Sequence, residues 1–210
     1  MAAPLEIEDP RSDLRFPQPP YTVDLLFELP DNGLRYEVLG GSLVVSPQPT
    51  PVHNLAADRL GRLIVPLLPL DAEPLTNTAI RMPGGDGPVP DLLVTSAVPD
   101  EHPKGLPAAF VHTVFEVVSP SNAATDRVFK TELYAEAGIP CYWRIEQRPW
   151  KEHFGPVPAI VVRLRRKDGE WQQTIAPTGT VSALPVVVDE EGTIVTVEID
   201  PAVLVGRRTA

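Results

Sequence analysis

VPDLLV at residues 89–94 and VFEVV at residues 114–118 decide the fold of this chain, because each is typical of a short buried β-strand that carries one carboxylate. Asp91 precedes an apolar run, and Glu116 has apolar residues on both sides. An ionised carboxylate in such surroundings is costly unless it is paired or holds a cation. Two of them so close in the chain favour one explanation, a shared divalent metal ion.

The helix predicted after the second strand supplies a lysine for such a site. Residues 123–137 have a helical pattern that Gly138 ends. Asp126 and Lys130 are four residues apart and lie on one face of this helix, with an exposed ion pair as the alternative interpretation. Hard cations such as Mg²⁺ or Mn²⁺ take oxygen ligands and lower the pKa of a bound water. A nearby lysine can orient that water and offset developing charge.

The rest of the chain predicts a mixed α/β fold with a β-rich C-terminal half. A proline-rich arm at residues 1–20 precedes a single domain at residues 21–210. A helix at residues 51–68 carries His53 in its first turn, where a core or capping role is expected. The predicted strands are 34–39 and 42–47, joined by a two-residue glycine turn, then 73–82, 88–95, 114–118, 139–146, 159–166, 170–177, 185–189 and 193–200. We expect residues 96–111 to form a loop and the last four strands to extend the sheet away from the site.

Composition predicts a cytoplasmic protein. No run approaches the length of a membrane-spanning apolar segment, and the first residues lack the features of a signal peptide. The single cysteine, Cys141, cannot form an internal disulfide, and it lies in a predicted buried strand. We therefore expect it to be a small core residue rather than a nucleophile.

Three segments carry a family resemblance: RYEVLGGSLVVSPQPTPVHNLAADRL at 35–60, VPDLLV at 89–94, and FEVVSPSNAATDRVFKTELYAEAGIPCYWRIE at 115–146. They resemble the Uma2 family of proposed endonucleases, which is also catalogued as a domain of unknown function and is placed in the PD-(D/E)XK nuclease superfamily. The resemblance extends from about Tyr21 to about Ile199. It implies a restriction-endonuclease-like core, with a mixed twisted β-sheet flanked by helices, and DNA as the substrate.

The resemblance implies a role for each of four residues. Asp91 corresponds to the motif aspartate of the superfamily, and Glu116 to the acidic residue of its (D/E)-x-K element. Val118 stands where that element has its lysine, and the Uma2-like pattern takes the lysine from the following helix, which is Lys130 here. Glu37 matches an early acidic position that could complete the metal site, with a solvent-facing edge-strand glutamate as the alternative. The Uma2-like pattern also has a histidine at the position of His53, close to where the site would open. The implied metal ligands are thus Asp91, Glu116 and Glu37, the implied cofactor is Mg²⁺ or Mn²⁺, and the implied assembly is a homodimer.

The formal net charge of −10 argues against a nucleic-acid-binding protein, because such proteins usually present a basic face. Three functions stay open: a metal-dependent endonuclease acting on DNA, a catalytically silent member of the same fold that serves as an interaction or accessory protein, and an enzyme that hydrolyses RNA or another phosphodiester with the same site. Val118 and the acidic charge favour the silent protein. The Lys130 ammonium separates the first two, since it either points into a cleft with the strand carboxylates or pairs outward with Asp126.

Overall fold

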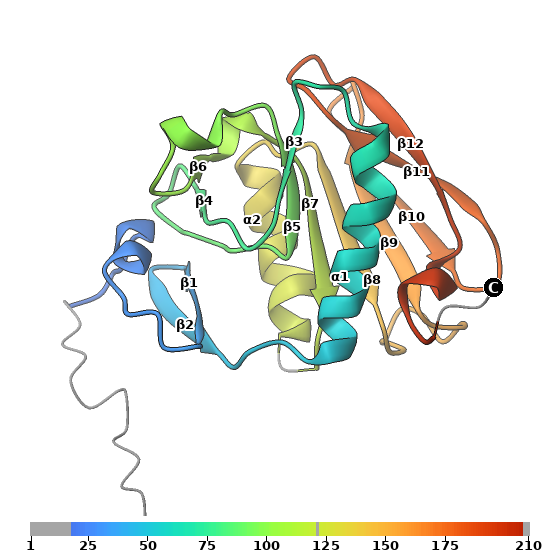
Figure 1. Ribbon diagram of the computed structural model, residues 1–210, viewed down its shortest axis with the longest axis horizontal. Helices are drawn as coiled ribbons and strands as arrows, with labels where there is room; N and C mark the ends of the chain where they lie inside the picture. Colours follow the sequence, from blue (N-terminus) through green and yellow to red (C-terminus); the bar gives the residue numbers. More distant parts are fainter. Residues whose placement is uncertain (1–17, 121, 208–210) are drawn as a thin grey trace, which may run out of the picture.

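A six-stranded mixed sheet forms the centre of the protein (Figure 1), in a computed structural model that describes residues 18–120 and 122–207. Most of the predicted N-terminal arm, residues 1–17, therefore lies outside the described residues. The strands are β3 (Glu73–Leu75), β5 (Leu92–Thr95), β7 (Val111–Val118), β8 (Cys141–Glu146), β9 (Ala159–Arg165) and β10 (Trp171–Pro177), in the spatial order β10-β9-β8-β7-β5-β3. β7 and β8 run parallel, and the other neighbouring pairs are antiparallel. The predicted mixed α/β fold is confirmed.

Helices cover both faces of this sheet (Figure 1). α1 (Pro51–Ile64) packs its apolar side against the face that carries Phe115. α2 (Lys130–Glu136) covers the opposite face, which carries Val114. All eight residues of β7 are buried as a result. Because successive side chains of a strand point to opposite faces, Glu116 shares the α2 face with Val114.

α1 begins and ends where local chemistry requires it. Thr50 caps its first turn by accepting a hydrogen bond from the His53 backbone N–H, and Pro51 follows at the first helical position. The helix ends at Ile64 rather than at the predicted residue 68, and a 3₁₀ turn, η2 (Val65–Leu67), continues it. Pro66 explains the early end, because a proline has no N–H for the helical ladder and clashes with the preceding turn.

The helix predicted at residues 123–137 is present, but its first half is not a regular α-helix. A π-helical turn, η5 (Thr125–Phe129), leads directly into α2. Gly138 ends the helix as predicted, with a left-handed φ of 82°. π turns inside helices are rare and often occur at functional sites, and this one lies where Asp126 and Lys130 are found.

A β-hairpin precedes α1 as predicted. Its strands are β1 (Arg35–Leu39) and β2 (Ser42–Ser46), joined by Gly40 and Gly41 with φ values of 57° and 69°. Both values lie in the left-handed region, which only glycine adopts without strain, so the two glycines specify the turn. A short 3₁₀ helix, η1 (Val23–Phe27), precedes the hairpin.

Three predictions about residues 73–111 were wrong in part. The predicted strand 73–82 is broken into β3 and β4 (Ile80–Arg81), and Asn77 adopts a left-handed φ of 48° between them. β4 pairs in parallel with β6 (Leu106–Pro107), a strand inside the predicted loop, which also contains the 3₁₀ turns η3 (Pro99–Glu101) and η4 (Ala108–Phe110). The predicted strand 88–95 is present only as β5, because Pro88 and Pro90 cannot donate to a sheet.

The C-terminal half follows the prediction for two of its four strands. β9 and β10 extend the central sheet, whereas β11 (Ser182–Val187) and β12 (Ile194–Ile199) form a separate hairpin. This hairpin packs against the same face of the sheet as α1, and a 3₁₀ turn, η6 (Pro201–Leu204), follows it. The expectation that all four strands extend the sheet was therefore wrong.

Cys141 is a core residue, as predicted. Its side chain is fully buried, and burial raises the pKa of its thiol to about 12. A thiol with such a pKa is protonated at neutral pH and therefore a poor nucleophile. Within the described residues, no helix is long and apolar enough to cross a membrane.

Thr113 connects the separate hairpin to the central sheet, and its loss should destabilise the fold. Its buried hydroxyl donates to the Val187 carbonyl at 2.8 Å and accepts from the Val187 N–H at 2.9 Å. Replacing Thr113→Val keeps the shape but leaves two buried backbone groups unpaired, so we expect a loss of about 2–4 kcal/mol in the free energy of unfolding. Thr196→Val, on the exposed side of β12, is the matched control and should change stability by less than about 0.5 kcal/mol. Equal urea midpoints for the two variants would contradict this account.

Candidate functional site

A cleft of about 740 Å³ opens at the edge of the sheet where β7 and β8 end and α1 begins. Its floor contains Glu37, Glu116 and Lys130, and Arg35 and His53 also line it. The polar residues of its rim are Ser46, Gln48, Thr50, Ser119, Asn122 and Gln147. Three of the four predicted site residues therefore lie in one cleft.

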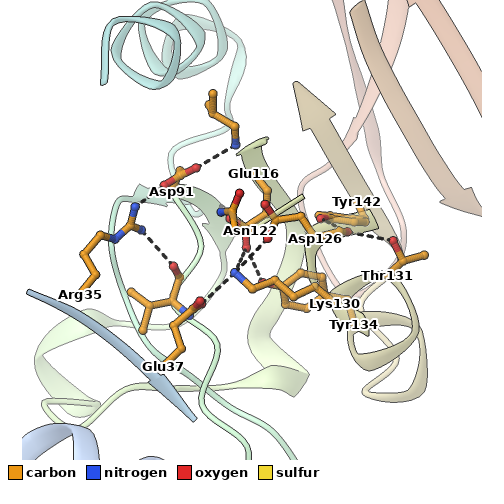
Figure 2. A network of polar contacts seen from close by, with 12 residues as sticks. Arg35, Glu37, Asp91, Glu116, Asn122, Asp126, Lys130, Thr131, Tyr134 and Tyr142 are labelled. Carbon is orange, nitrogen blue, oxygen red and sulfur yellow. Dashed lines mark hydrogen bonds and ion pairs between the residues drawn. The ribbon is translucent and has the colours of Figure 1, made fainter. Parts of the chain in front are cut away.

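Lys130 is the centre of this site (Figure 2). Its side chain is 2% exposed, and its ammonium lies 2.8 Å from Oε1 of Glu116 and 2.8 Å from Oε1 of Glu37. Glu116 comes from β7, Glu37 from β1 and Lys130 from the first turn of α2. The ammonium thus points into the cleft toward the strand carboxylates and is not paired outward with Asp126 alone.

Tyr134 fixes the Glu116 carboxylate from the same helix. Its hydroxyl donates to Oε1 of Glu116 at 2.9 Å, and it lies one turn after Lys130. Tyr134 is itself buried and packs against Tyr142 at 5.1 Å between ring centroids. Two donors from one helix therefore converge on one oxygen atom of β7.

Asp126 is buried beside Lys130, so the alternative of an exposed ion pair is wrong. Its Oδ1 lies 3.5 Å from the Lys130 ammonium, and neither carboxylate oxygen has a hydrogen-bond partner among the described residues. Its backbone carbonyl accepts hydrogen bonds from the hydroxyls of Tyr142 and Thr131 instead. The π turn thus places a carboxylate with free acceptor capacity next to the lysine (Figure 2).

Asp91 lies immediately before β5 and is held by three donors. Its Oδ2 accepts from the Val117 backbone N–H at 2.8 Å and lies 3.1 Å from Nε2 of His53. Its Oδ1 accepts from Arg35 at 3.0 Å, and Arg35 also donates to the Val89 carbonyl. Arg35 is the most exposed of these partners, with 22% of its side chain accessible, so it is the partner that can be displaced most easily.

Sequence reasoning missed Arg35, and it placed a histidine near the site at His53 without predicting its contact with Asp91. Arg35 is two residues before Glu37, and in a strand this spacing puts both side chains on the same face. That alternation was the available signal. His53 is not the core or capping histidine that was expected, because it faces Asp91 and lines the cleft. Its Nδ1 is buried without a hydrogen-bond partner among the described residues.

Burial and charge shift the protonation equilibria of the cluster. Burial raises the pKa of Glu116 well above its usual value, with Asp126 and Asp91 acting in the same direction against Lys130. Burial likewise raises the pKa of Asp126 to about 6. For Lys130, burial lowers the pKa, but Glu116, Glu37 and Asp126 together outweigh it and hold the pKa well above the usual value. Burial also opposes ionisation of Asp91, yet the pKa of this carboxyl is lowered by His53 and Arg35.

The carboxylate oxygens of the site and their excess negative charge both suit a hard divalent cation. Four carboxylates face the two permanent cations Arg35 and Lys130, which leaves two formal negative charges when all four are ionised. Carboxylate oxygens are the ligands that Mg²⁺ and Mn²⁺ prefer. Among residues 18–120 and 122–207, however, no three His, Cys, Asp or Glu side chains are grouped as a metal site. In the arrangement present, the Arg35 and Lys130 nitrogens contact the carboxylates instead, so the predicted ligation by Asp91, Glu116 and Glu37 stays a prediction.

Comparisons with known proteins place this chain in a family. No curated protein matches the chain. Among solved structures, the chain is similar to a putative nuclease belonging to DUF820 from Anabaena variabilis ATCC 29413, with a TM-score of 0.60 and 16% sequence identity over 87% of this chain and 96% of that chain. At this identity the likeness shows a shared fold, which confirms the expected fold class. The family model named Uma2 and described as "Putative restriction endonuclease" matches residues 23–195. Because this match spans most of the sequence, the protein belongs to the Uma2 family.

Proposed function

We propose that this protein is a divalent-metal-dependent endonuclease that hydrolyses phosphodiester bonds of DNA. The observation that carries the proposal is the Lys130 ammonium, which lies within 2.8 Å of two carboxylates inside the cleft although β7 has a valine at position 118. The family description and the nuclease fold of the similar structure support the same reaction class.

Each residue of the candidate site has its own role in the proposed reaction. Asp91, Glu116 and Glu37 would hold Mg²⁺ or Mn²⁺, which when bound polarises a phosphate and lowers the pKa of a water ligand. Lys130 would orient the attacking water and offset the charge that develops on the phosphate, because its ammonium is fixed by burial and needs no reorganisation. Val117 and His53 would hold Asp91 in place through Oδ2, leaving Oδ1 as the atom that faces the exchangeable Arg35.

One observation favours a catalytically silent protein as the second candidate. Every acidic residue of the cluster has a cationic neighbour in the arrangement present, so the charges can be explained as a structural ion-pair network. Metal binding by Asp91 requires that Arg35 be displaced, whereas a silent protein can keep the arrangement present. A homodimer belongs to the first proposal only, since cutting both strands of a duplex calls for two copies of the cleft.

The first prediction concerns cleavage of supercoiled plasmid. At low salt with Mg²⁺ or Mn²⁺, we expect the purified protein to nick or linearise the plasmid, and we expect Asp91→Asn and Lys130→Ala each to abolish this activity. Both changes remove a group that the proposed chemistry uses. Asp71→Asn, an exposed carboxylate beyond the far end of α1, is the control and should cleave like the wild type. Gel electrophoresis of time courses measures the outcome. No cleavage with either metal, or cleavage that survives both site substitutions and so comes from another nuclease in the preparation, would favour the silent protein.

A second prediction separates catalysis from folding, because Lys130→Ala removes a buried cation and can cost about 3–5 kcal/mol of stability. Glu116→Gln keeps the oxygen that accepts from Lys130 and Tyr134 but removes a charge that burial disfavours. We therefore expect a Tm at pH 7.5 that is unchanged or higher, together with a fall in cleavage rate of at least about 100-fold. A variant that remains active, or one that loses activity only by unfolding, would contradict the metal-ligand role.

A third prediction uses the raised pKa of Asp126, about 6 against an ordinary 3.8. The folded protein binds this proton more tightly than the unfolded chain, so ionisation between these two values lowers wild-type stability as the pH rises. About 1 kcal/mol of this loss in stability falls between pH 5 and pH 8. Asp126→Asn does not titrate, so its Tm relative to the wild type should be higher at pH 8 than at pH 5. A difference in Tm that is independent of pH would show that Asp126 stays ionised throughout.

A further inference from the structure

Phe154 is the most exposed aromatic residue that the structure describes. It lies in the connection between β8 and β9, residues 147–158, and is 88% exposed. The other exposed phenylalanines, Phe27, Phe110 and Phe129, are between 37% and 41% exposed. A single exposed apolar side chain is ordinary on a protein surface, so exposure alone assigns no role. Two further observations suggest a binding role for Phe154: the structure of the connection and its position relative to the cleft.

The connection is a fixed turn that presents this ring. Trp150 anchors it by packing into a small buried cluster with Ala159 and Val161. Trp150 and His153 exchange two backbone hydrogen bonds of 3.2 and 2.9 Å, and their rings stack with centroids 4.6 Å apart. A Cβ at Gly155 would approach the His153 ring to 2.6 Å, so glycine is needed there for the stack to form. The backbone of Phe154 is therefore held between two constrained residues, which lowers the cost of ordering this segment when a ligand binds.

Both ends of the connection line the candidate active-site cleft. Gln147 and Arg148 contribute from the end of β8, and Val157 and Pro158 from the segment before β9. In Figure 1 the connection lies at the same edge of the sheet as the beginning of α1. The exposed cations Arg148 and Lys151 belong to it as well. The same short segment thus presents one aromatic ring and two positive charges, together with the exposed carboxylate of Glu152, at the edge where the cleft opens.

This combination matches the chemistry of an unpaired nucleotide. Base-on-aromatic stacking is favourable for every base, and neighbouring cations contact the phosphates on either side. With a net charge of −10, the chain as a whole gains little from long-range attraction of a polyanion, so short-range contacts must supply the affinity. A base inside a duplex has both faces covered by its neighbours. An exposed ring can stack only on a base that is unpaired or has left the duplex.

We propose that Phe154 stacks on an unpaired base of a DNA strand that lies in the cleft, while Arg148 and Lys151 contact adjacent phosphates. The substrate class of the nuclease is then single-stranded DNA, or duplex DNA with unpaired nucleotides next to the cut. The identification of the ligand as DNA rests on the proposed function.

Binding without metal tests this inference independently of cleavage. A fluorescein-labelled single strand of about 12 nucleotides and the blunt duplex of the same sequence are titrated with protein in EDTA, and anisotropy reports the Kd. The wild type should bind the single strand more tightly than the duplex. Phe154→Ala should weaken single-strand binding about tenfold, and Phe154→Trp should preserve it, because stacking is worth roughly 1–3 kcal/mol per base. The matched control is Leu70→Ala: Leu70 is fully exposed beyond the other end of α1, roughly 21 Å along that helix, and should have no effect.

Several results would overturn the inference. They are wild-type protein that does not bind the single strand, Phe154→Ala that binds like the wild type, and Phe154→Leu that binds like the wild type, since leucine keeps apolar area without a ring face. Sedimentation that changes from dimer to monomer in Phe154→Ala would assign the ring to contact with a second copy of the chain instead. A protein that shows the expected binding but never cleaves DNA with either metal would refute the proposed hydrolysis and leave the stacking contact standing.

Discussion

The buried ammonium of Lys130 is the interaction on which the site depends. Its transfer out of water is costly, and only close carboxylates and hydrogen bonds compensate for that cost. The carboxylates come from the hairpin, the central strand and the π turn, in the form of Glu37, Glu116 and Asp126. The cation therefore joins the distant hairpin to the central strand and to the π turn that precedes its own helix. If it were absent, like charges would face one another in a largely buried site, where solvent screens them poorly.

A lysine delivered by a helix can replace one delivered by the strand because the position of the ammonium matters and its backbone origin does not. Residues 116 and 118 of β7 share one face of the sheet by strand alternation. α2 packs on that face, so a lysine in its first turn reaches Glu116 from above the strand. The hydrogen bond from Tyr134 to the same oxygen fixes the helix at the required depth. Val118 is then free to pack as an apolar residue at the rim of the cleft.

Local chemistry made much of the fold predictable. Gly40 and Gly41 specify the first hairpin because both need a left-handed backbone, and Gly138 ends the site helix for the same reason. The predictions failed where distant contacts decide the structure. Nothing near Asn77 in the sequence indicates that the strand breaks there, and the placement of β11 depends on a pairing with Thr113 across 74 residues. In the site, Asp91 and Glu116 could be singled out as candidates by the presence of charge in apolar segments, and Lys130 by its place on the following helix and by the family resemblance. The contacts of His53 and Arg35 with Asp91 could not be predicted, because these two residues reach Asp91 only after α1 and β1 have docked.

The cluster is a poor solution for stability alone. Burial opposes ionisation of Glu116 and Asp126, and Asp126 has no hydrogen bond to either oxygen among the described residues, so apolar side chains of similar size would cost less. A site of this kind is expected where charges are held ready for a ligand, because perturbed ionisable groups in a cleft are typical of functional sites. When all four carboxylates are ionised, the two formal negative charges in excess around Lys130 and Arg35 weaken the binding of a DNA backbone until a divalent cation neutralises them. An acidic protein can therefore act on a polyanion if its site contributes acidic oxygens to a metal and the segment beside its cleft contributes a stacking contact and local cations, as proposed for Phe154, Arg148 and Lys151.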